Sequence, residues 1–200
     1  MHSIEALNQA IFLQVNASAD TATWAIDLAI VIGNDLIFTI PLLLLGIWLW
    51  GDNDKRSAAL KSCAVAFIAL GLNQLIGLFW QHPRPFDMGL GHTFLAHVAD
   101  SSFPSDHGTV FASIAFTLLF SGLPLLGAIT LLAGCAVAWA RVFLGVHFPL
   151  DMVGAVMVSV VTYAIVNLAW TKIGDGITYR IASLYRKVFA WPISSGWIKR

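Results

Sequence analysis

Charged side chains are scarce in this sequence. Asp, Glu, Lys and Arg together make up 11% of its 200 residues, whereas soluble domains carry about 25%. Hydrophobic residues account for 58%, and several apolar runs approach the roughly 20 residues that a helix needs to cross a bilayer. An ordinary soluble protein is therefore excluded, and we predict an integral membrane protein with a single domain over residues 1–200.

An excess of one charge is also missing, because 11 basic residues balance 11 acidic ones. Proteins that bind nucleic acid carry a basic surface, so no nucleic-acid partner is expected. The two cysteines, Cys63 and Cys135, lie inside apolar runs and indicate neither a disulfide framework nor a metal site. A cleavable signal peptide is not expected either, since residues 1–19 lack a basic start and an uninterrupted apolar stretch.

The apolar runs predict an all-α, polytopic membrane helix bundle of five or six transmembrane helices. Strong runs cover residues 36–50, 58–80, 108–122, 125–144 and 149–170. A shorter stretch at 22–33 is separated from the first run by Asn34-Asp35, and neither piece reaches spanning length alone. The run ends carry Trp48, Trp50, Trp80 and Trp170, as interfacial anchors do. The apolar runs do not decide where the first transmembrane helix begins.

The two ends of the chain have a different pattern. Residues 1–20 contain an amphipathic helix with Ile4, Leu7, Ile11 and Phe12 on one side. Residues 171–200 form a basic tail with aromatic residues, which suits a membrane surface. Nine of the 11 Lys and Arg residues lie in this tail or near the first clear hairpin, and the positive-inside rule makes that side cytoplasmic. The opposite loops then face the periplasm of a bacterial inner membrane.

The polar residues of these opposite loops gather in three short strings. They are Arg84-Pro85, Phe103-Pro104-Ser105-Asp106-His107, and the stretch from Arg141 through His147 to Asp151. Two arginines, two histidines, a serine and an aspartate at a membrane edge are the components of a phosphate-ester hydrolase without a metal. We therefore take these strings as the candidate active site.

Each of these residues also has a purely structural interpretation. Ser105 can simply cap the helix that follows it, although a helix N-terminus also binds phosphate. Arg84 and Arg141 can be interfacial side chains that reach for water, or bidentate phosphate ligands. His147 and Asp151 are four residues apart, so a helix that begins near them puts both on one face. Asp151 then either complements the helix dipole or orients His147 as a nucleophile.

Taken together, the strings resemble the type 2 phosphatidic acid phosphatase superfamily. That family carries Lys-x6-Arg-Pro, Pro-Ser-Gly-His and Ser-Arg-x5-His-x3-Asp in this order, and the matching stretches here are 77–85, 104–107 and 140–151. The resemblance implies phosphate-binding roles for Arg84, Ser105 and Arg141, and catalytic roles for His147, His107 and Asp151. It further implies a phosphohistidine intermediate on His147 and no cofactor or metal.

Three positions depart from the family pattern: Gly77 replaces the lysine, Asp106 the glycine and Ala140 the first serine. We expect Asp106 to repel substrate or to tune His107, and His82 or a backbone donor to stand in for the missing lysine. The Gly77 and Asp106 forms, with the basic tail, look like the bacterial undecaprenyl-diphosphate phosphatase branch.

The resemblance to that branch implies hydrolysis of a polyprenyl diphosphate lipid, undecaprenyl diphosphate, which recycles the carrier lipid of cell-wall synthesis. A phosphatidylglycerophosphate or phosphatidic acid phosphatase, or a lipid A phosphotransferase, would use the same chemistry. A small membrane transporter is the alternative from a different class. It is suggested by polar residues inside apolar runs, namely Asn34, Asp35, Asn73 and Gln74, but no paired repeat of the transporter type supports it.

Overall fold

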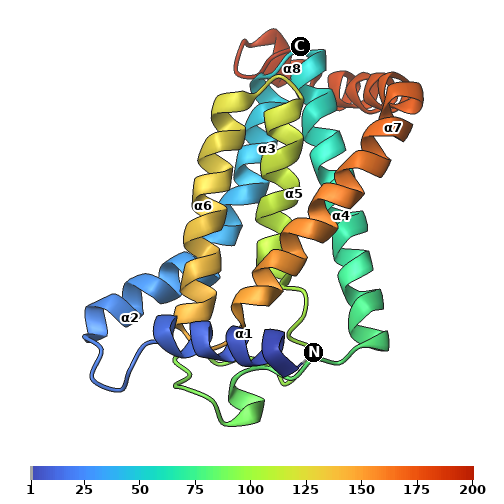
Figure 1. The fold of residues 1–200 in the computed structure, drawn as a ribbon. Coiled ribbons are helices and arrows are strands. Elements are labelled where there is room, and N and C mark those ends of the chain that lie inside the picture. Colours follow the sequence, from blue (N-terminus) through green and yellow to red (C-terminus); the bar gives the residue numbers. More distant parts are fainter. Residues whose placement is uncertain (1) are drawn as a thin grey trace.

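The computed structural model describes residues 2–200, which form a helical bundle (Figure 1). The bundle proper consists of α3 (Thr39–Trp50), α4 (Asn53–Phe79), α5 (Asp106–Phe120), α6 (Pro124–Phe143) and α7 (Pro149–Val188). It is flanked by α1 (His2–Val15), α2 (Thr23–Ile30), a short 3-10 turn η3 (Phe86–Met88) and α8 (Ala190–Ser194). No strand occurs within residues 2–200, and the predicted all-α fold class is confirmed.

The first crossing is one continuous helical segment. α2 passes through a π-helical turn, η1 (Val31–Asp35), and a 3-10 turn, η2 (Leu36–Phe38), into α3. Asn34 lies inside the π-helical turn and does not interrupt the segment, and its Nδ2 donates to Asp35 Oδ1 at 2.7 Å. Thr23–Trp50 therefore supplies 28 residues, enough for a full crossing. The irregular turns also allow α2 to bend away from the bundle axis (Figure 1).

Within residues 2–200, four segments are long and apolar enough to span a membrane: Thr23–Trp50, α4, α6 and α7. α5 is shorter, with 15 residues, or about 22 Å at the usual helical rise. It packs against α4, α6 and α7, and its side chains Phe111, Ile114 and Leu118 are buried in the core. α5 is thus the central helix of the bundle, a shorter apolar helix among the four candidate spans.

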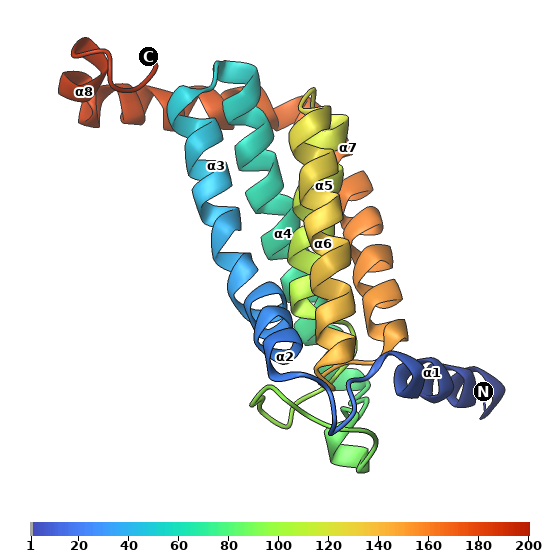
Figure 2. The ribbon, with the colours of Figure 1, turned by 90° about the vertical axis from the view of Figure 1, so that its left-hand side faces the viewer.

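The C-terminal tail continues the last crossing as a helix. α7 has 40 residues, and its second half turns across the end of the bundle before α8 (Figure 2). Arg56, which is fully buried, holds this end through hydrogen bonds from its Nη2 to Lys199 O at 2.8 Å and from its Nε to Trp48 O at 3.0 Å. Its guanidinium carbon lies 4.7 Å from the Tyr185 ring centroid, a cation–π contact. The tail is therefore packed against the bundle.

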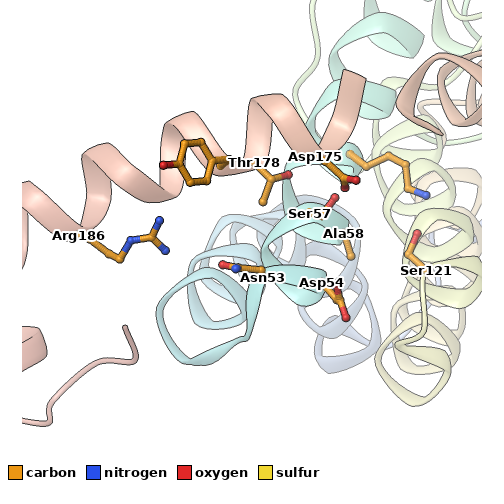
Figure 3. A pocket seen from close by; sticks show the side chains of 10 residues that line it. Asn53, Asp54, Ser57, Ala58, Ser121, Asp175, Thr178 and Arg186 are labelled. Carbon is orange, nitrogen blue, oxygen red and sulfur yellow. The ribbon is translucent and has the colours of Figure 1, made fainter. Parts of the chain in front are cut away.

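A polar cavity of about 310 Å³ lies between this tail and the start of α4 (Figure 3). Its lining residues include Asn53, Asp54, Asp175, Thr178 and Arg186. Because α4 runs the length of the bundle, this cavity lies at the end opposite to the loops that carry the polar strings (Figure 1).

α1 lies across that opposite end, roughly perpendicular to the bundle (Figure 2). Three of the four apolar residues expected on one side, Ile4, Leu7 and Ile11, are exposed. Phe12 is the exception, because it is fully buried with its ring centroid 5.3 Å from that of Phe148. The amphipathic helix is thus present, and its protein-facing side carries Phe12.

The contact between α5 and α6 depends on Gly127. A Cβ added there would lie 2.5 Å from the backbone nitrogen of Leu119, so the two helices would have to move apart. We expect Gly127→Ala to lower the free energy of unfolding by about 1–3 kcal/mol, measured as a lower thermal midpoint in detergent micelles.

Gly46→Ala is the matched control, because nothing lies within 4 Å of its added Cβ. Alanine is favoured over glycine inside a helix by about 0.5–1 kcal/mol, so this variant should be as stable as the parent or more so. Equal midpoints for the two variants would contradict the importance of the close α5–α6 contact.

Candidate active site

The polar strings meet at the α1 end of the bundle, around a cavity of about 810 Å³. Its walls come from the end of α4, the loop over residues 80–105, the start of α5, the end of α6 and the α6–α7 connection. Six of the predicted residues line it: His82, Arg84, Asp106, His107, Arg141 and His147. The other two, Ser105 and Asp151, are buried. Within residues 2–200, no cluster of three His, Cys, Asp or Glu side chains is arranged to hold a metal ion.

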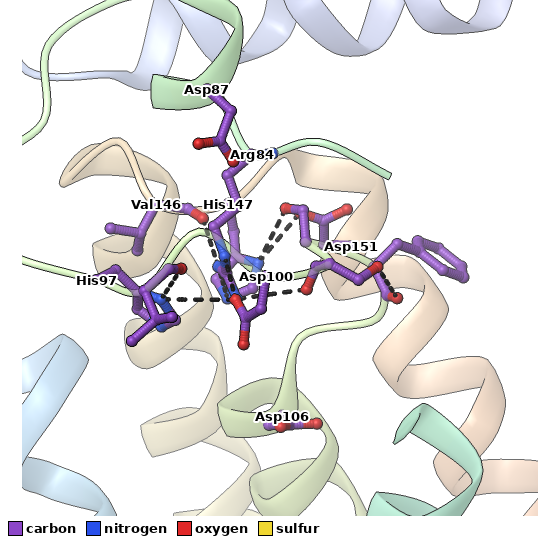
Figure 4. A network of polar contacts seen from close by, with 12 residues as sticks. Arg84, Asp87, His97, Asp100, Asp106, Val146, His147 and Asp151 are labelled. Carbon is purple, nitrogen blue, oxygen red and sulfur yellow. Dashed lines mark hydrogen bonds and ion pairs between the residues drawn. The ribbon is translucent and has the colours of Figure 1, made fainter. Parts of the chain in front are cut away.

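His147 and Asp151 contact each other at the start of α7. His147 Nδ1 lies 3.1 Å from Asp151 Oδ2 (Figure 4), as the four-residue spacing at a helix start predicts. The same oxygen accepts a hydrogen bond from the Phe148 N–H at 2.8 Å and another from the Ser102 hydroxyl. With a carboxylate beside Nδ1, that nitrogen carries the proton, and the lone pair of the ring is on Nε2.

The Nε2 atom of His147 faces Arg84. It lies 3.2 Å from Arg84 Nη1, which also donates to Val146 O at 2.8 Å (Figure 4). Both side chains are buried. Burial, together with the nearby positive charges of Arg141 and Arg84, lowers the pKa of His147 well below its usual value. The ring is therefore neutral near pH 7, with its lone pair on the cationic side of the cavity.

Ser105 caps α5 and Arg141 approaches the same cavity from α6. Ser105 Oγ accepts from the Gly108 N–H at 3.3 Å, so the capping interpretation of the sequence holds for this serine. Arg141 is buried, and its Nη1 donates to Gly33 O at 3.5 Å. Its Nε has no hydrogen-bond partner within residues 2–200. A buried guanidinium with a free donor that lines a cavity favours an anionic ligand.

Asp106 lies at the first turn of α5, where two amide side chains hold it. Asn73 Nδ2 donates to its Oδ1 at 2.8 Å, and Gln74 Nε2 donates to its Oδ2 at 3.2 Å. His107 follows it in the chain and is half-buried at the cavity wall. The amides that interrupt the apolar run of α4 therefore position a carboxylate beside the predicted proton donor.

His82 lines the cavity, but its observed polar contact is with α1. Its Nε2 lies 3.4 Å from Glu5 Oε2. Gly77, at the position of the family lysine, faces Ser101, since an added Cβ would lie 3.3 Å from Ser101 Cβ. The role of His82 in place of that lysine stays a prediction.

Two loop residues that the sequence analysis did not single out complete the site. Ser102, which is fully buried, donates to Asp151, and its Oγ lies 3.4 Å from His147 Nδ1. Asp100 contacts Arg84, with its Oδ1 2.8 Å from both Nε and Nη2. The loop has no helical period, so no spacing rule marks either residue. The one available signal is their closeness in sequence to Ser105.

Known proteins are similar to this chain in sequence. The family model described as PAP2 superfamily matches residues 58–175. "Putative undecaprenyl-diphosphatase YbjG" of Escherichia coli (strain K12) is 38% identical over 196 residues, which cover 98% of this chain and 99% of that protein. "Undecaprenyl-diphosphatase BcrC" of Bacillus subtilis (strain 168) is 34% identical over 125 residues, 62% of this chain and 64% of that protein.

Two solved structures share the fold. LpxE of Aquifex aeolicus has a TM-score of 0.63 at 19% identity, over 80% of this chain and 94% of that one. The PAP2 type phosphatidylglycerolphosphate phosphatase from Bacillus subtilis has a TM-score of 0.64 at 20% identity, over 86% of this chain and 89% of that one. At these identities the likeness concerns the fold alone.

The surroundings of His147 predict a neutral ring across the physiological range. Because its pKa is lowered, the ring stays unprotonated as pH falls through 6.5 and gains a proton only well below that value. Arg84→Gln should raise the midpoint, since it removes one of the nearby positive charges. Ring-proton NMR of histidine-labelled protein measures the titration, with His147→Gln to assign the signal. A parent midpoint at or above 6.5 would contradict this geometry.

Proposed function

Since this chain belongs to the PAP2 superfamily, we propose that it hydrolyses undecaprenyl diphosphate to undecaprenyl phosphate and inorganic phosphate. The chain is a phosphatase with several membrane-spanning helices. The observation that carries the proposal is the placement of His147, with Asp151 at one ring nitrogen and Arg84 at the other. The relative that matches nearly the whole chain is named for this substrate.

In the first step, Nε2 of His147 attacks the terminal phosphorus of the diphosphate. An N–P bond forms and the bond from phosphorus to the bridging oxygen breaks, which gives a phosphohistidine and undecaprenyl phosphate. His107 donates a proton to the leaving oxygen. Arg84, Ser105 and Arg141 bind the oxygens of the transferring phosphoryl group, where the two positive charges offset the developing negative charge.

In the second step, water attacks the phosphohistidine. The N–P bond breaks, inorganic phosphate leaves, and His107 takes up the proton that the attacking water gives away. Asp151 holds the proton on Nδ1 of His147 throughout, so Nε2 remains the reacting atom. The same carboxylate stabilises the positive charge that the ring gains during attack.

We also propose that the site faces the periplasm of a bacterial inner membrane, with the basic tail in the cytoplasm. The tail lies at one end of the bundle, and the connection between α6 and α7, which carries His147, lies at the other (Figure 1). Basic segments remain on the cytoplasmic side. In this orientation the enzyme meets lipid diphosphate in the outer leaflet. Its product is the monophosphate form of the carrier lipid, ready for another round of cell-wall synthesis.

The first test is phosphate release from undecaprenyl diphosphate by purified protein in detergent with EDTA. We expect robust release by the parent and a loss of about 10³-fold or more for His147→Gln. His92→Gln is the matched control, because it makes the same change at an exposed loop histidine outside the cavity lining, and it should keep full activity.

Full turnover by His147→Gln, or a requirement for an added divalent ion, would overturn the proposed mechanism. Release from phosphatidic acid or phosphatidylglycerophosphate, and none from undecaprenyl diphosphate, would keep the mechanism and change the substrate.

The role of Asp151 is tested separately. Asp151→Asn should leave the fold intact but lower kcat by about 10²–10⁴-fold, because an amide no longer fixes the proton on His147 Nδ1. Ser102→Ala removes one donor to that carboxylate and should cost about 10-fold. Steady-state rates measure the loss of kcat for each variant, and thermal unfolding curves show whether its fold is intact. If Asp151→Asn hydrolyses substrate as fast as the parent protein, then Asp151 only complements the helix dipole and does not orient His147.

A further inference from the structure

The guanidinium of Arg84 already has an anionic partner in the cavity. Its Nη1 donates to Val146 O at 2.8 Å and lies 3.2 Å from His147 Nε2. Its other edge, formed by Nε and Nη2, is bound to Asp100, whose Oδ1 is 2.8 Å from each of these atoms (Figure 4). Nη2 also donates to the Ser101 backbone carbonyl at 3.4 Å. Arg84 therefore has Nη1 bonded to one backbone carbonyl, while its Nε and Nη2 edge is bonded to a carboxylate and, through Nη2, to a second carbonyl.

The two partners of this ion pair differ in exposure. The Arg84 side chain is 5% exposed, whereas that of Asp100 is 59% exposed. Asp100 belongs to the irregular loop over residues 80–105 and lines the cavity. Nε and Nη2 contact it through a single oxygen, Oδ1, which also lies 3.9 Å from His97 Nδ1. A carboxylate in this position can move into water at small cost, while the buried guanidinium cannot follow it.

The edge that Asp100 occupies is the one that suits a phosphate. Nε and Nη2 of an arginine point in parallel and bind two oxygens of a phosphate or a carboxylate. Nη1 of Arg84 is next to the attacking nitrogen of His147, so a phosphoryl group that reacts there has its oxygens beside the same guanidinium. Carboxylate and phosphate therefore compete for one set of donors.

We propose that Asp100 is a positioning residue that occupies the phosphate-binding edge of Arg84 in the empty site and exchanges with the substrate phosphate. This inference rests on the proposed function, because it needs Arg84 to be a phosphate ligand. In the empty enzyme Asp100 keeps the buried guanidinium paired and oriented. After hydrolysis its return to Arg84 displaces inorganic phosphate and favours release of the product.

The test is direct binding of inorganic phosphate to the purified full-length protein in detergent, by isothermal titration calorimetry. Asp100→Asn keeps the size of the side chain but removes the competing charge, and it should bind phosphate about 10-fold more tightly than the parent. Asp100→Ala should show a gain in the same direction. In steady-state hydrolysis, both variants should be inhibited by inorganic phosphate at correspondingly lower concentrations.

Asp87→Asn is the matched control for the general charge of the cavity. Asp87 lines the same cavity, but its Oδ2 accepts from the backbone N–H of Arg84 at 3.2 Å instead of contacting the guanidinium. We expect its effect on phosphate affinity to stay within about 2-fold, because a solvated charge that does not contact the guanidinium is well screened.

An equal gain for Asp87→Asn and Asp100→Asn would overturn the inference, because the effect would then be one of overall charge. Weaker phosphate binding by the Asp100 variants would also overturn the inference, because Asp100 would then merely support Arg84. Unchanged or undetectable phosphate binding in all variants would overturn it too. Tighter binding without hydrolysis of undecaprenyl diphosphate would retain the inference and reject the proposed substrate. Hydrolysis of undecaprenyl diphosphate with unchanged phosphate affinity in the Asp100 variants would retain the proposed substrate and reject the inference.

Discussion

The hydrogen-bonded carboxylate of Asp151 is the contact on which the active-site end of the bundle depends. The residue is 1% exposed, and a buried carboxylate is tolerated only where donors surround it. Its Oδ2 accepts hydrogen bonds from the Phe148 N–H and the Ser102 hydroxyl and lies beside His147 Nδ1, whereas its Oδ1 has no hydrogen-bond partner within residues 2–200. Its backbone carbonyl also accepts from the Ser105 N–H at 3.2 Å. One helical turn therefore joins the start of α7, the start of α5 and the loop between α4 and α5.

α1 extends this arrangement towards the membrane surface. Asn8 Oδ1 accepts from the Leu150 N–H at 3.0 Å, in the same first turn of α7 that holds Asp151. Glu5, one helical turn earlier, lies beside His82 of the active-site loop. The outward-facing side of α1 is apolar, as in helices that lie in the interface of a bilayer. A surface helix is thus bonded directly to the elements that position the candidate catalytic residues.

The cavity carries more negative charge than the family pattern does. Gly77 in place of lysine removes a positive charge, and Asp106 in place of glycine adds a negative one. Two amide donors from α4 satisfy Asp106, so its carboxylate does not need Arg84 or Arg141 as a partner. The remaining positive charge is concentrated in two buried guanidinium groups, whose charge is not lost at any physiological pH. Phosphate affinity in such a site depends on which other protein groups contact the two guanidinium groups.

Much of this molecule could be predicted from local sequence. The apolar runs predict the helical class and the membrane crossings. The order of the crossings then places all three polar strings at one end of the bundle. The contact between His147 and Asp151 also follows from local geometry, because residues four apart at a helix start share a face. The tertiary structure alone decided that the first crossing runs through Asn34 and that Phe12 faces inward. It also decided the contacts of Ser102 with Asp151, 49 residues away, and of Asp100 with Arg84, 16 residues away. Such contacts form in an irregular loop, whose path is set by the packed helices at its ends and not by any period of its own sequence.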